Sequence, residues 1–256
     1  IIGGYKSMRR YLIDVTERLI DETDVLVLSG YTGTAKTKFL KTQNNSIDLE
    51  ELANHRGSSF GRNLTPQPTQ ISFENNLAIE LLNFENGNRE TLLLEDESRL
   101  IGARSLPLSL KSKMDCSDIV MIDENFDYRV SQIYEDYVVN LFNEFELRVN
   151  RSGSHVTEDD PVLLYKEFLE SSTLRIKKRL GGAGLKQVMD LINSSIENQI
   201  KTGECLQHKS WITYLLKHYY DPMYQYQVMK KKKRIIFKGN TAEVNQYFEE
   251  PQKVPL

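Results

Sequence analysis

Short apolar runs and helical segments alternate through the first half of the chain. The apolar runs typical of strands cover residues 25–29 (VLVLS), 46–49 (SIDL), 91–95 (TLLLE) and 118–122 (DIVMI). They are rich in leucine and β-branched residues on both faces, as expected of strands that helices cover on both sides. Strands alternating with helices indicate crossover units on a parallel sheet, so the pattern predicts an α/β fold with flanking helices. A late run over residues 234–239 (RIIFKG) and a helix over residues 241–248 are predicted to return to this sheet.

The second half of the chain has the periodicity of helices. Apolar side chains recur at helical spacing between residues 128 and 145, at positions 130, 133, 134, 137, 141 and 145. Asp160 followed by Pro161 is typical of a helix start, and the glycines of residues 180–184 (LGGAG) predict a break before the helix resumes. We therefore predict an α/β core over residues 1–126 and 227–256 and a mainly helical subdomain over residues 127–226.

Composition limits the classes of protein that fit. The 256 residues are 39% hydrophobic and 27% charged, which is enough for one sizeable core with an appended subdomain. The net charge of -3 excludes a uniformly basic nucleic-acid-binding protein, so any RNA contact has to come from local patches. Cys116 and Cys205 lack the spacing of a zinc or redox motif, and no apolar run approaches the roughly 18 residues that a membrane span needs. These features predict a cytoplasmic protein without membrane contact.

A glycine-bearing turn follows the first predicted strand. Its sequence, GYTGTAKT, nearly matches the phosphate-binding pattern G-x-x-x-x-G-K-[ST], with Ala35 in place of the second glycine. In such a loop, backbone N–H groups and the lysine hold phosphate oxygens, and the last hydroxyl can hold Mg²⁺. If Ala35 has a positive φ, its methyl group costs about 1 kcal/mol, which the surrounding fold can absorb.

The alternative to a phosphate site is an ordinary strand-to-helix turn. Position, lysine and threonine all favour phosphate binding, and they predict a P-loop NTPase-like arrangement of the sheet. The predicted phosphate-binding residues are Gly30, Tyr31, Thr32, Gly33, Thr34, Ala35, Lys36 and Thr37.

An acidic turn follows another predicted strand. The sequence EDESR places Glu95, Asp96, Glu97 and Arg99 at the carboxyl end of that strand. In phosphoryl-transfer folds a carboxylate at this position usually anchors Mg²⁺ or a metal-bound water. The alternative is a solvated acidic turn. We predict a Mg²⁺ site formed by Thr37 and Asp96, with Glu97 as the alternative carboxylate, and we take Glu97 and Arg99 as candidate catalytic residues.

Two basic stretches, LRIKKRL and MKKKKR, are candidate RNA contacts. Tyrosines just before the second stretch offer faces on which unpaired bases stack, while the cations hold the RNA backbone. A solvated charged surface and tyrosines packed in the core are the alternatives. The candidate RNA-binding residues are Arg175, Lys177, Lys178, Arg179, Tyr220, Tyr224, Lys231 and Lys232.

Several motifs together resemble one family of RNA-modifying enzymes. The segment DLEELANHRGSSFG (48–61) gathers polar groups around glycines that let a backbone approach a ligand. With GGYKSMRR (3–10), EDESRLIG (95–102) and YYDPMYQYQ (219–227), it resembles the P-loop domain of tRNA 2-selenouridine synthase over nearly the whole chain. The candidate substrate-loop residues are Asp48, His55, Arg56, Gly57, Ser58 and Ser59.

The resemblance implies a two-step exchange at the wobble 2-thiouridine in the anticodon loop of certain tRNAs. The sulfur first attacks geranyl diphosphate and expels diphosphate; selenophosphate then supplies selenium, and the geranylated sulfur departs. Neither step requires ATP, so the loop is expected to hold a prenyl diphosphate or the phosphate of selenophosphate. Lys36 and Arg56 are expected to neutralise charge on the leaving group.

The resemblance also bears on partners. Bacterial members of the family carry a rhodanese domain before the matching part, and nothing in this sequence resembles that domain. We expect either a separated subunit, as in archaeal versions, with a distinct rhodanese protein as partner, or a part of a fused enzyme. The family usually has glycine where Ala35 stands here. The loop alone would also fit a small-molecule or nucleoside kinase using ATP, or a noncatalytic tRNA-binding subunit.

Overall fold

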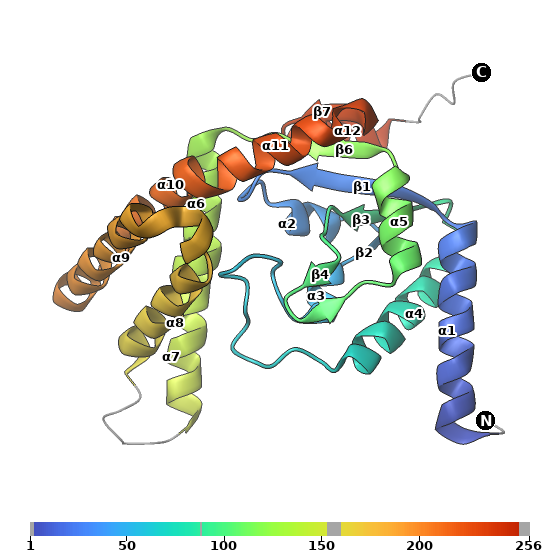
Figure 1. The fold of residues 1–256 in the computed structure, drawn as a ribbon, viewed down its shortest axis with the longest axis horizontal. Coiled ribbons are helices and arrows are strands. Elements are labelled where there is room, and N and C mark those ends of the chain that lie inside the picture. Colours follow the sequence, from blue (N-terminus) through green and yellow to red (C-terminus); the bar gives the residue numbers. More distant parts are fainter. Residues whose placement is uncertain (1–2, 88, 153–159, 251–256) are drawn as a thin grey trace. The chain divides into compact units, whose positions relative to one another are not determined.

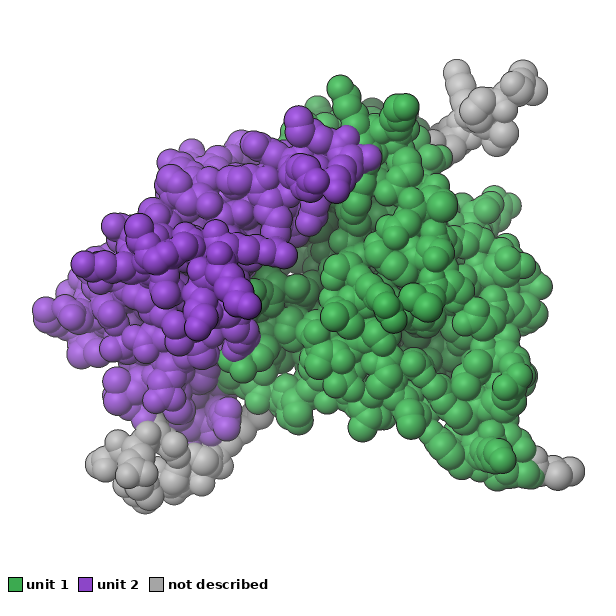
Figure 2. Space-filling model, viewed as in Figure 1, with its two compact units in different colours: residues 1–30, 35–123, 231–256 green, residues 31–34, 124–230 purple. Residues whose placement is uncertain are grey.

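The computed structural model of the chain describes residues 3–87, 89–152 and 160–250 (Figure 1). The chain divides into two compact units, shown in different colours in Figure 2. The first unit comprises residues 1–30, 35–123 and 231–256, and the second comprises residues 31–34 and 124–230. The sequence predicts the boundaries between the α/β core and the helical subdomain at residues 126/127 and 226/227. Within the described ranges, no helix combines the length and apolar character that a membrane span requires.

A parallel sheet forms the centre of the first unit, as predicted. Its five strands are β1 (Asp24–Gly30), β2 (Ser46–Ile47), β3 (Thr91–Glu95), β6 (Ile119–Ile122) and β7 (Ile235–Gly239). They pair in the order β2-β3-β1-β6-β7, and every pairing is parallel. The chain moves outward from β1 to β2 and then crosses back past β1 to β6. The carboxyl end of β1 therefore lies where the direction of winding changes, which is where open α/β sheets bind ligands.

Helices cover both faces of this sheet. The helices of the first unit are α1 (Gly4–Glu22), α2 (Lys36–Leu40), α3 (Leu49–Ala53), α4 (Gln70–Asn86), α5 (Leu108–Cys116) and α12 (Thr241–Glu249). A small antiparallel hairpin, β4 (Leu100–Ile101) with β5 (Arg104–Ser105), follows the acidic turn. Alternate strand residues enter separate hydrophobic clusters, because neighbouring side chains of a strand point to opposite faces.

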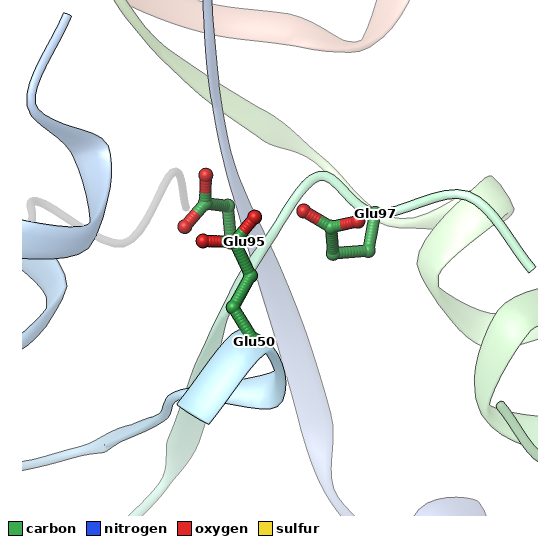
Figure 3. Close-up of side chains that lie close together, drawn as sticks. All are labelled: Glu50, Glu95 and Glu97. Carbon is green, nitrogen blue, oxygen red and sulfur yellow. The ribbon is translucent and has the colours of Figure 1, made fainter. Parts of the chain in front are cut away.

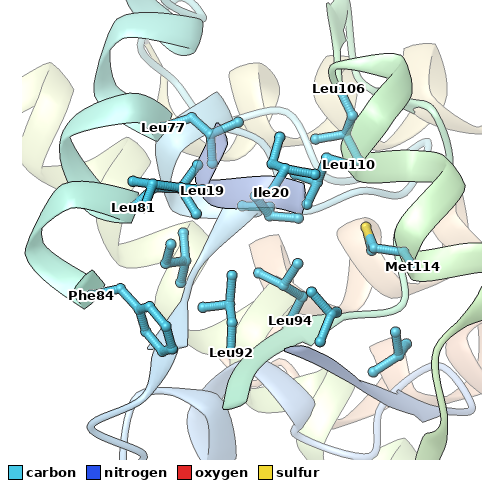
Figure 4. Packing of buried hydrophobic residues seen from close by; sticks show 14 of the residues in the cluster. Leu19, Ile20, Leu77, Leu81, Phe84, Leu92, Leu94, Leu106, Leu110 and Met114 are labelled. Atoms are coloured by element: carbon cyan, nitrogen blue, oxygen red, sulfur yellow. The ribbon is translucent and has the colours of Figure 1, made fainter. Parts of the chain in front are cut away.

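The larger cluster joins the sheet to α1, α4 and α5. Leu92 and Leu94 of β3 lie in it with Leu19 and Leu110 (Figure 4). Leu93, between them in the sequence, packs in the other cluster against α2 and α12. Both sides of β3 are thus buried, which explains why its sequence is a continuous apolar run without polar alternation.

Side-chain caps fix several helix starts. Thr69 accepts a hydrogen bond from the Ser72 backbone N–H at 3.1 Å and caps α4. Asn240 and Glu243 form a reciprocal capping box at the start of α12. In the second unit, Asp160 accepts from the Val162 N–H at 2.7 Å, as its place before Pro161 predicts.

The second unit is helical in its described part. Its elements are α6 (Phe126–Tyr134), the π-helix η1 (Glu135–Asn140), α7 (Leu141–Ser152), α8 (Pro161–Arg175), α9 (Lys177–Thr202), the 3₁₀ turn η2 (Leu206–His208), α10 (Lys209–Leu215), the π-helix η3 (Leu216–Tyr220) and α11 (Asp221–Lys231). A 3₁₀ turn, η4 (Lys232–Arg234), leads back to β7. The predicted helix over residues 128–145 thus contains a π segment, and Gly181 forms the predicted break inside α9 with φ of 75°.

A hydrogen-bonded polar group lies inside the helical unit. The Trp211 Nε1–H donates to His208 Nδ1 at 2.9 Å, and His208 Nε2 lies 3.1 Å from Gln199 Oε1. His208 is fully buried, and burial lowers its pKa to about 4. Because Nδ1 accepts from the indole, the ring is the neutral tautomer with its proton on Nε2. This arrangement satisfies the buried polar atoms of the ring and fixes the packing of α9 against α10.

Candidate active site

The predicted phosphate loop leaves the sheet at the end of its central strand. Gly30 is the last residue of β1, and Lys36 is the first of α2. Ala35 has φ of 58° and ψ of 29°, which is the left-handed conformation. The Lys36 ammonium donates to the Gly30 carbonyl at 3.1 Å, so the side chain folds back over the loop. Helix α2 is only five residues long.

Two carboxyl groups surround the last residue of the loop. The Thr37 hydroxyl lies 3.1 Å from Glu95 Oε2 and 3.4 Å from Glu50 Oε2. Lys36 Nζ lies 3.6 Å from the other oxygen of Glu95. Glu95 ends β3, beside β1 in the sheet, and Glu50 projects from the first turn of α3. The lysine and threonine of the loop therefore share one acidic environment.

A third carboxyl group completes this cluster. Glu50, Glu95 and Glu97 each place an oxygen within 4.8 Å of the other two (Figure 3). Burial, and then repulsion from Glu95 and Glu97, raises the pKa of Glu50 to about 10. Burial, and then Glu95, raises the pKa of Glu97 to about 8, and burial also raises the pKa of Glu95 against the opposing effect of Lys36. One positive charge from Lys36 does not balance three carboxylates, so without a further cation Glu50 and Glu97 favour the protonated form.

The predicted substrate loop touches the cluster through a glycine. Gly57 has φ of 64°, and a Cβ atom there would lie 2.4 Å from Glu50 Oε1 and 3.2 Å from a Glu97 oxygen. The backbone reverses around it, since the Arg56 N–H donates to the Gly61 carbonyl at 2.7 Å. Any larger residue at position 57 would displace the carboxyl groups, so this glycine is needed both for its φ and for its close approach.

The other four substrate-loop residues lie around this turn of the chain or cap the helix before it. Asp48 caps α3 by accepting from the Glu51 N–H at 2.8 Å. His55 is buried, and burial followed by the charge of Arg62 lowers its pKa. Its Nδ1 is buried with no hydrogen-bond partner in the described part of the chain. Ser58 and Ser59 are half-buried, and the Ser58 Oγ accepts from the Phe60 N–H at 3.2 Å.

The structure places Glu95, rather than Asp96, beside Thr37. Asp96 accepts from the Ser29 hydroxyl at 2.8 Å and pairs with Lys231 Nζ at 2.6 Å. Neighbouring residues at the end of a strand point to opposite sides, which separates Asp96 from Glu95. Beyond the strand the backbone turns, since the Glu97 N–H donates to the Glu95 carbonyl at 2.8 Å. The Thr37 hydroxyl therefore lies against Glu95 and Glu50, while Asp96 is engaged with Ser29 and Lys231, and metal binding by any of these groups stays a prediction.

The remaining predicted catalytic residues, Arg56 and Arg99, lie in the two loops next to the cluster. Arg56 is half-buried directly before Gly57. Arg99 is exposed at the start of the β4–β5 hairpin, where its carbonyl accepts from the Leu106 N–H at 2.9 Å. A role for either side chain stays a prediction.

The candidate RNA-binding residues divide into exposed and engaged side chains. Lys177, Lys178 and Arg179 are exposed at the start of α9, and Lys232 is exposed in η4. Tyr220, however, is only 9% exposed, so its ring lacks the open face that base stacking requires. The ring centroid of Tyr224 lies 6.1 Å from that of Tyr31, and Lys231 is paired with Asp96. The start of α9 is thus the most accessible of the predicted contact regions.

Glu50 is the site residue that the sequence patterns missed. It lies in DLEELANHRG, where an acidic residue in the first turn of a helix is ordinary. Its distance of 13 residues from Thr37 and 45 from Glu95 gives no local signal. One feature of the sequence does indicate Glu50, namely its position just after β2. The carboxyl ends of the parallel strands β2 and β3 lie at the same edge of the sheet, so a residue after β2 lies near the end of β3.

The donor set around Thr37 fits Mg²⁺. One hydroxyl and three carboxyl groups supply the hard oxygen ligands that this ion prefers. Lys36 brings one positive charge to three acidic groups, so a divalent cation would balance them. The residues that would hold it are Thr37, Glu95, Glu50 and Glu97.

The fold and this geometry together define a class of protein. A parallel sheet with a lysine–threonine loop after its central strand and a carboxylate at the end of the neighbouring strand is a P-loop α/β protein. Sequence comparison adds the family: the profile described as the tRNA 2-selenouridine synthase AAA domain matches residues 23–254. The chain belongs to this family.

Curated relatives match over almost the whole chain. A tRNA 2-selenouridine synthase of Shewanella sp. (strain ANA-3) is 42% identical over 96% of this chain, and one of Shewanella sp. (strain MR-4) is 43% identical over 98%. That of Pseudomonas aeruginosa (strain LESB58) is 42% identical over 98% of the chain. The chain spans 66%, 64% and 66% of the length of these three relatives. No solved structure matches the chain.

Proposed function

We propose that this chain transfers a geranyl group from geranyl diphosphate to the sulfur of wobble 2-thiouridine in tRNA. We further propose that it takes part in replacing the geranylated sulfur by selenium from selenophosphate: selenium bonds to C2, geranylthiol leaves, and water takes the phosphoryl group as inorganic phosphate. The observation that carries the proposal is the placement of Lys36 and Thr37 against Glu95 and Glu50 at the carboxyl ends of the strands. The family supports tRNA as the substrate, because its relatives are named tRNA 2-selenouridine synthases.

The alkyl-transfer step needs little covalent chemistry from the protein. The thiocarbonyl sulfur attacks C1 of the geranyl group, the C1–O bond breaks, and its electron pair leaves with diphosphate. The N3 proton of the thiouridine is lost as the S-geranyl product becomes neutral. The protein's task is to neutralise charge that builds on the leaving oxygens. Lys36 is positioned for this, because its ammonium already lies over the loop at the Gly30 carbonyl.

The acidic cluster has a complementary role. When ionised, the three carboxyl groups would repel a diphosphate, so they favour a substrate that arrives with a divalent cation. Mg²⁺ bound there would supply positive charge to the diphosphate oxygens. Thr37 and Glu95 would orient that ion, and Gly57 keeps the backbone of the substrate loop within contact of Glu50 and Glu97. On this proposal the site has no need of ATP.

The selenium step extends the proposal to partners. We propose that a rhodanese domain, in the same protein or in a separate one, cooperates in it. The exposed cations at the start of α9, Lys177, Lys178 and Arg179, are proposed to hold the tRNA backbone.

A direct assay tests the transfer. The purified chain would be incubated with tRNA containing wobble 2-thiouridine, geranyl diphosphate and Mg²⁺, without ATP, and the digested nucleosides would be analysed by mass spectrometry. We expect a geranyl mass increment that is absent with unmodified uridine. ATP hydrolysis in the presence of a small-molecule acceptor, without the increment, would favour a kinase instead. Intact tRNA binding with no chemistry would favour a noncatalytic subunit.

A further inference from the structure

The tip of the phosphate loop, residues 31–34, is held by a buried arginine of the helical unit. Arg129 of α6 donates from Nε to the Thr32 carbonyl at 2.9 Å. Its side chain is 6% exposed, and its charge lies 5.1 Å from the centroid of the Tyr31 ring. One side chain therefore contacts two consecutive residues of the tip.

Asp221 fixes this arginine from behind. The two terminal nitrogens of Arg129 bind the two carboxylate oxygens of Asp221, with one contact at 3.2 Å and one shorter. Asp221 is the acidic residue of the YYDPMY motif, to which the active-site chemistry gives no role. A bidentate pair with Nε used elsewhere leaves the guanidinium plane a single orientation.

The contact with Thr32 sets the direction of the next peptide group. In a trans peptide the C=O and N–H point to opposite sides. With the Thr32 carbonyl turned toward Arg129, the Gly33 N–H points away from α6. Gly33 has φ of 85°, and a Cβ atom there would lie 2.7 Å from the Arg129 carbonyl, so the tip backbone sits directly on the helix.

We propose that Arg129 and Asp221 are positioning residues that preorganise the loop tip for its anionic ligand. The inference rests on the proposed function, since it assumes that the loop binds a diphosphate. Without the pair, the Thr32–Gly33 peptide can rotate and present its carbonyl where the N–H should be. A carbonyl repels an anion, so only the fraction of molecules with the correct peptide orientation binds.

Removing the two partners separately and together distinguishes positioning from folding. Arg129→Met leaves the half-buried Asp221 without its partner, so it should lower both the melting temperature and the affinity for inorganic pyrophosphate. The double variant Arg129→Met with Asp221→Leu removes the unpaired charge and should regain thermal stability. Its affinity for pyrophosphate with Mg²⁺, measured by titration calorimetry, should nevertheless stay about tenfold weaker, as expected when about one tenth of the loops are competent.

Two further variants complete the test. Tyr165→Phe removes the hydrogen bond of 2.9 Å to the Tyr137 carbonyl in the same unit and serves as a control for lost stability. It should lower the melting temperature and leave pyrophosphate binding unchanged. Arg129→Lys retains the charge but cannot reach Thr32 and both Asp221 oxygens together, so it should bind pyrophosphate more weakly.

The outcomes separate this inference from the proposed function. If the unaltered chain binds pyrophosphate and the double variant binds it equally well, the positioning role is wrong and the phosphate site stands. The positioning role is also wrong if Tyr165→Phe loses affinity for pyrophosphate in proportion to its loss of stability, because destabilising the helical unit would then be enough to weaken binding. If the unaltered chain binds no pyrophosphate, or binds it as well as Lys36→Ala does, both the proposed function and this inference fail.

Discussion

Thr37 and Glu95, 58 residues apart in the sequence, meet at 3.1 Å between the threonine hydroxyl and a carboxylate oxygen. The contact joins the phosphate loop to the end of the neighbouring strand. It also brings Lys36 within 3.6 Å of the same carboxyl group. Lys36 would neutralise charge on a leaving diphosphate, and Thr37 would bind a divalent cation. The two are adjacent residues of the short helix α2.

Removing the Lys36 ammonium should impair transfer strongly. For Lys36→Ala we expect kcat/KM for geranyl transfer to fall by about 10²–10³, because a preorganised charge at a leaving group contributes about 3–4 kcal/mol. Lys38→Ala is the matched control, since Lys38 is exposed on the same helix. Equal rates for the two variants would show that the loop lysine has no part in the chemistry.

Neutralising Glu95 and Asp96 should have different consequences. Glu95→Gln should abolish stimulation by Mg²⁺, because Glu95 is the carboxylate in contact with Thr37. Asp96→Asn should retain that stimulation and lose stability only, since Asp96 pairs with Ser29 and Lys231. Titrating Mg²⁺ in the transfer assay distinguishes them. Loss of Mg²⁺ dependence in Asp96→Asn alone would restore the ligand set predicted from the sequence.

The different contacts of Glu95 and Asp96 show which features can be predicted from the sequence and which require the tertiary structure. The strands follow from apolar runs, because a sheet buried on both faces requires them, and Asp160, the glycine break and Ala35 follow from local backbone rules. Helices α1 and α4 do not follow from those runs. Whether Glu95 or Asp96 faces the loop depends on a shift of one residue in the register of the strand. Glu50 and Lys231 lie far from Thr37 and Asp96 in the sequence and contact them only in the folded chain. The sequence predicts that Tyr220 can stack on a base, but its side chain is buried in the fold.

Glycine at position 35 should stabilise the loop. Ala35 has φ of 58°, where a Cβ atom costs roughly 1 kcal/mol that glycine does not pay. We expect Ala35→Gly to raise the free energy of unfolding by up to about 1 kcal/mol, the gain being reduced by the greater freedom of the unfolded chain. Urea denaturation measures this. A clear loss of stability would mean that the left-handed conformation is absent in solution.

The start of α9 should contribute to the salt dependence of tRNA binding. Lys177 and Lys178 are exposed there. Replacing both by alanine should reduce the slope of log K against log salt by about 1.5, if each contacts one phosphate. Lys201→Ala, in the last turn of the same helix, is the control. An unchanged slope in the double variant would place the tRNA elsewhere.

His208 should make the protein less stable in acid. In the unfolded chain a histidine takes up a proton below its ordinary pKa of 6.5, whereas buried His208 stays neutral down to about 4. The unfolded state therefore binds the proton first, and stability falls as pH drops through this window. We expect the unaltered chain to lose up to about 3 kcal/mol relative to His208→Gln between these pH values. Parallel pH profiles of unfolding would contradict the buried neutral ring.

The most direct test of the central claim asks which phosphate compound the loop prefers. The chain, saturated with labelled pyrophosphate and Mg²⁺, would be titrated separately with geranyl diphosphate and with ATP, in the unaltered form and in Lys36→Ala. We predict displacement by geranyl diphosphate at a concentration about tenfold or more below that needed for ATP, with affinity lost in Lys36→Ala. Displacement by ATP at the lower concentration, accompanied by its hydrolysis, would contradict a prenyl diphosphate site.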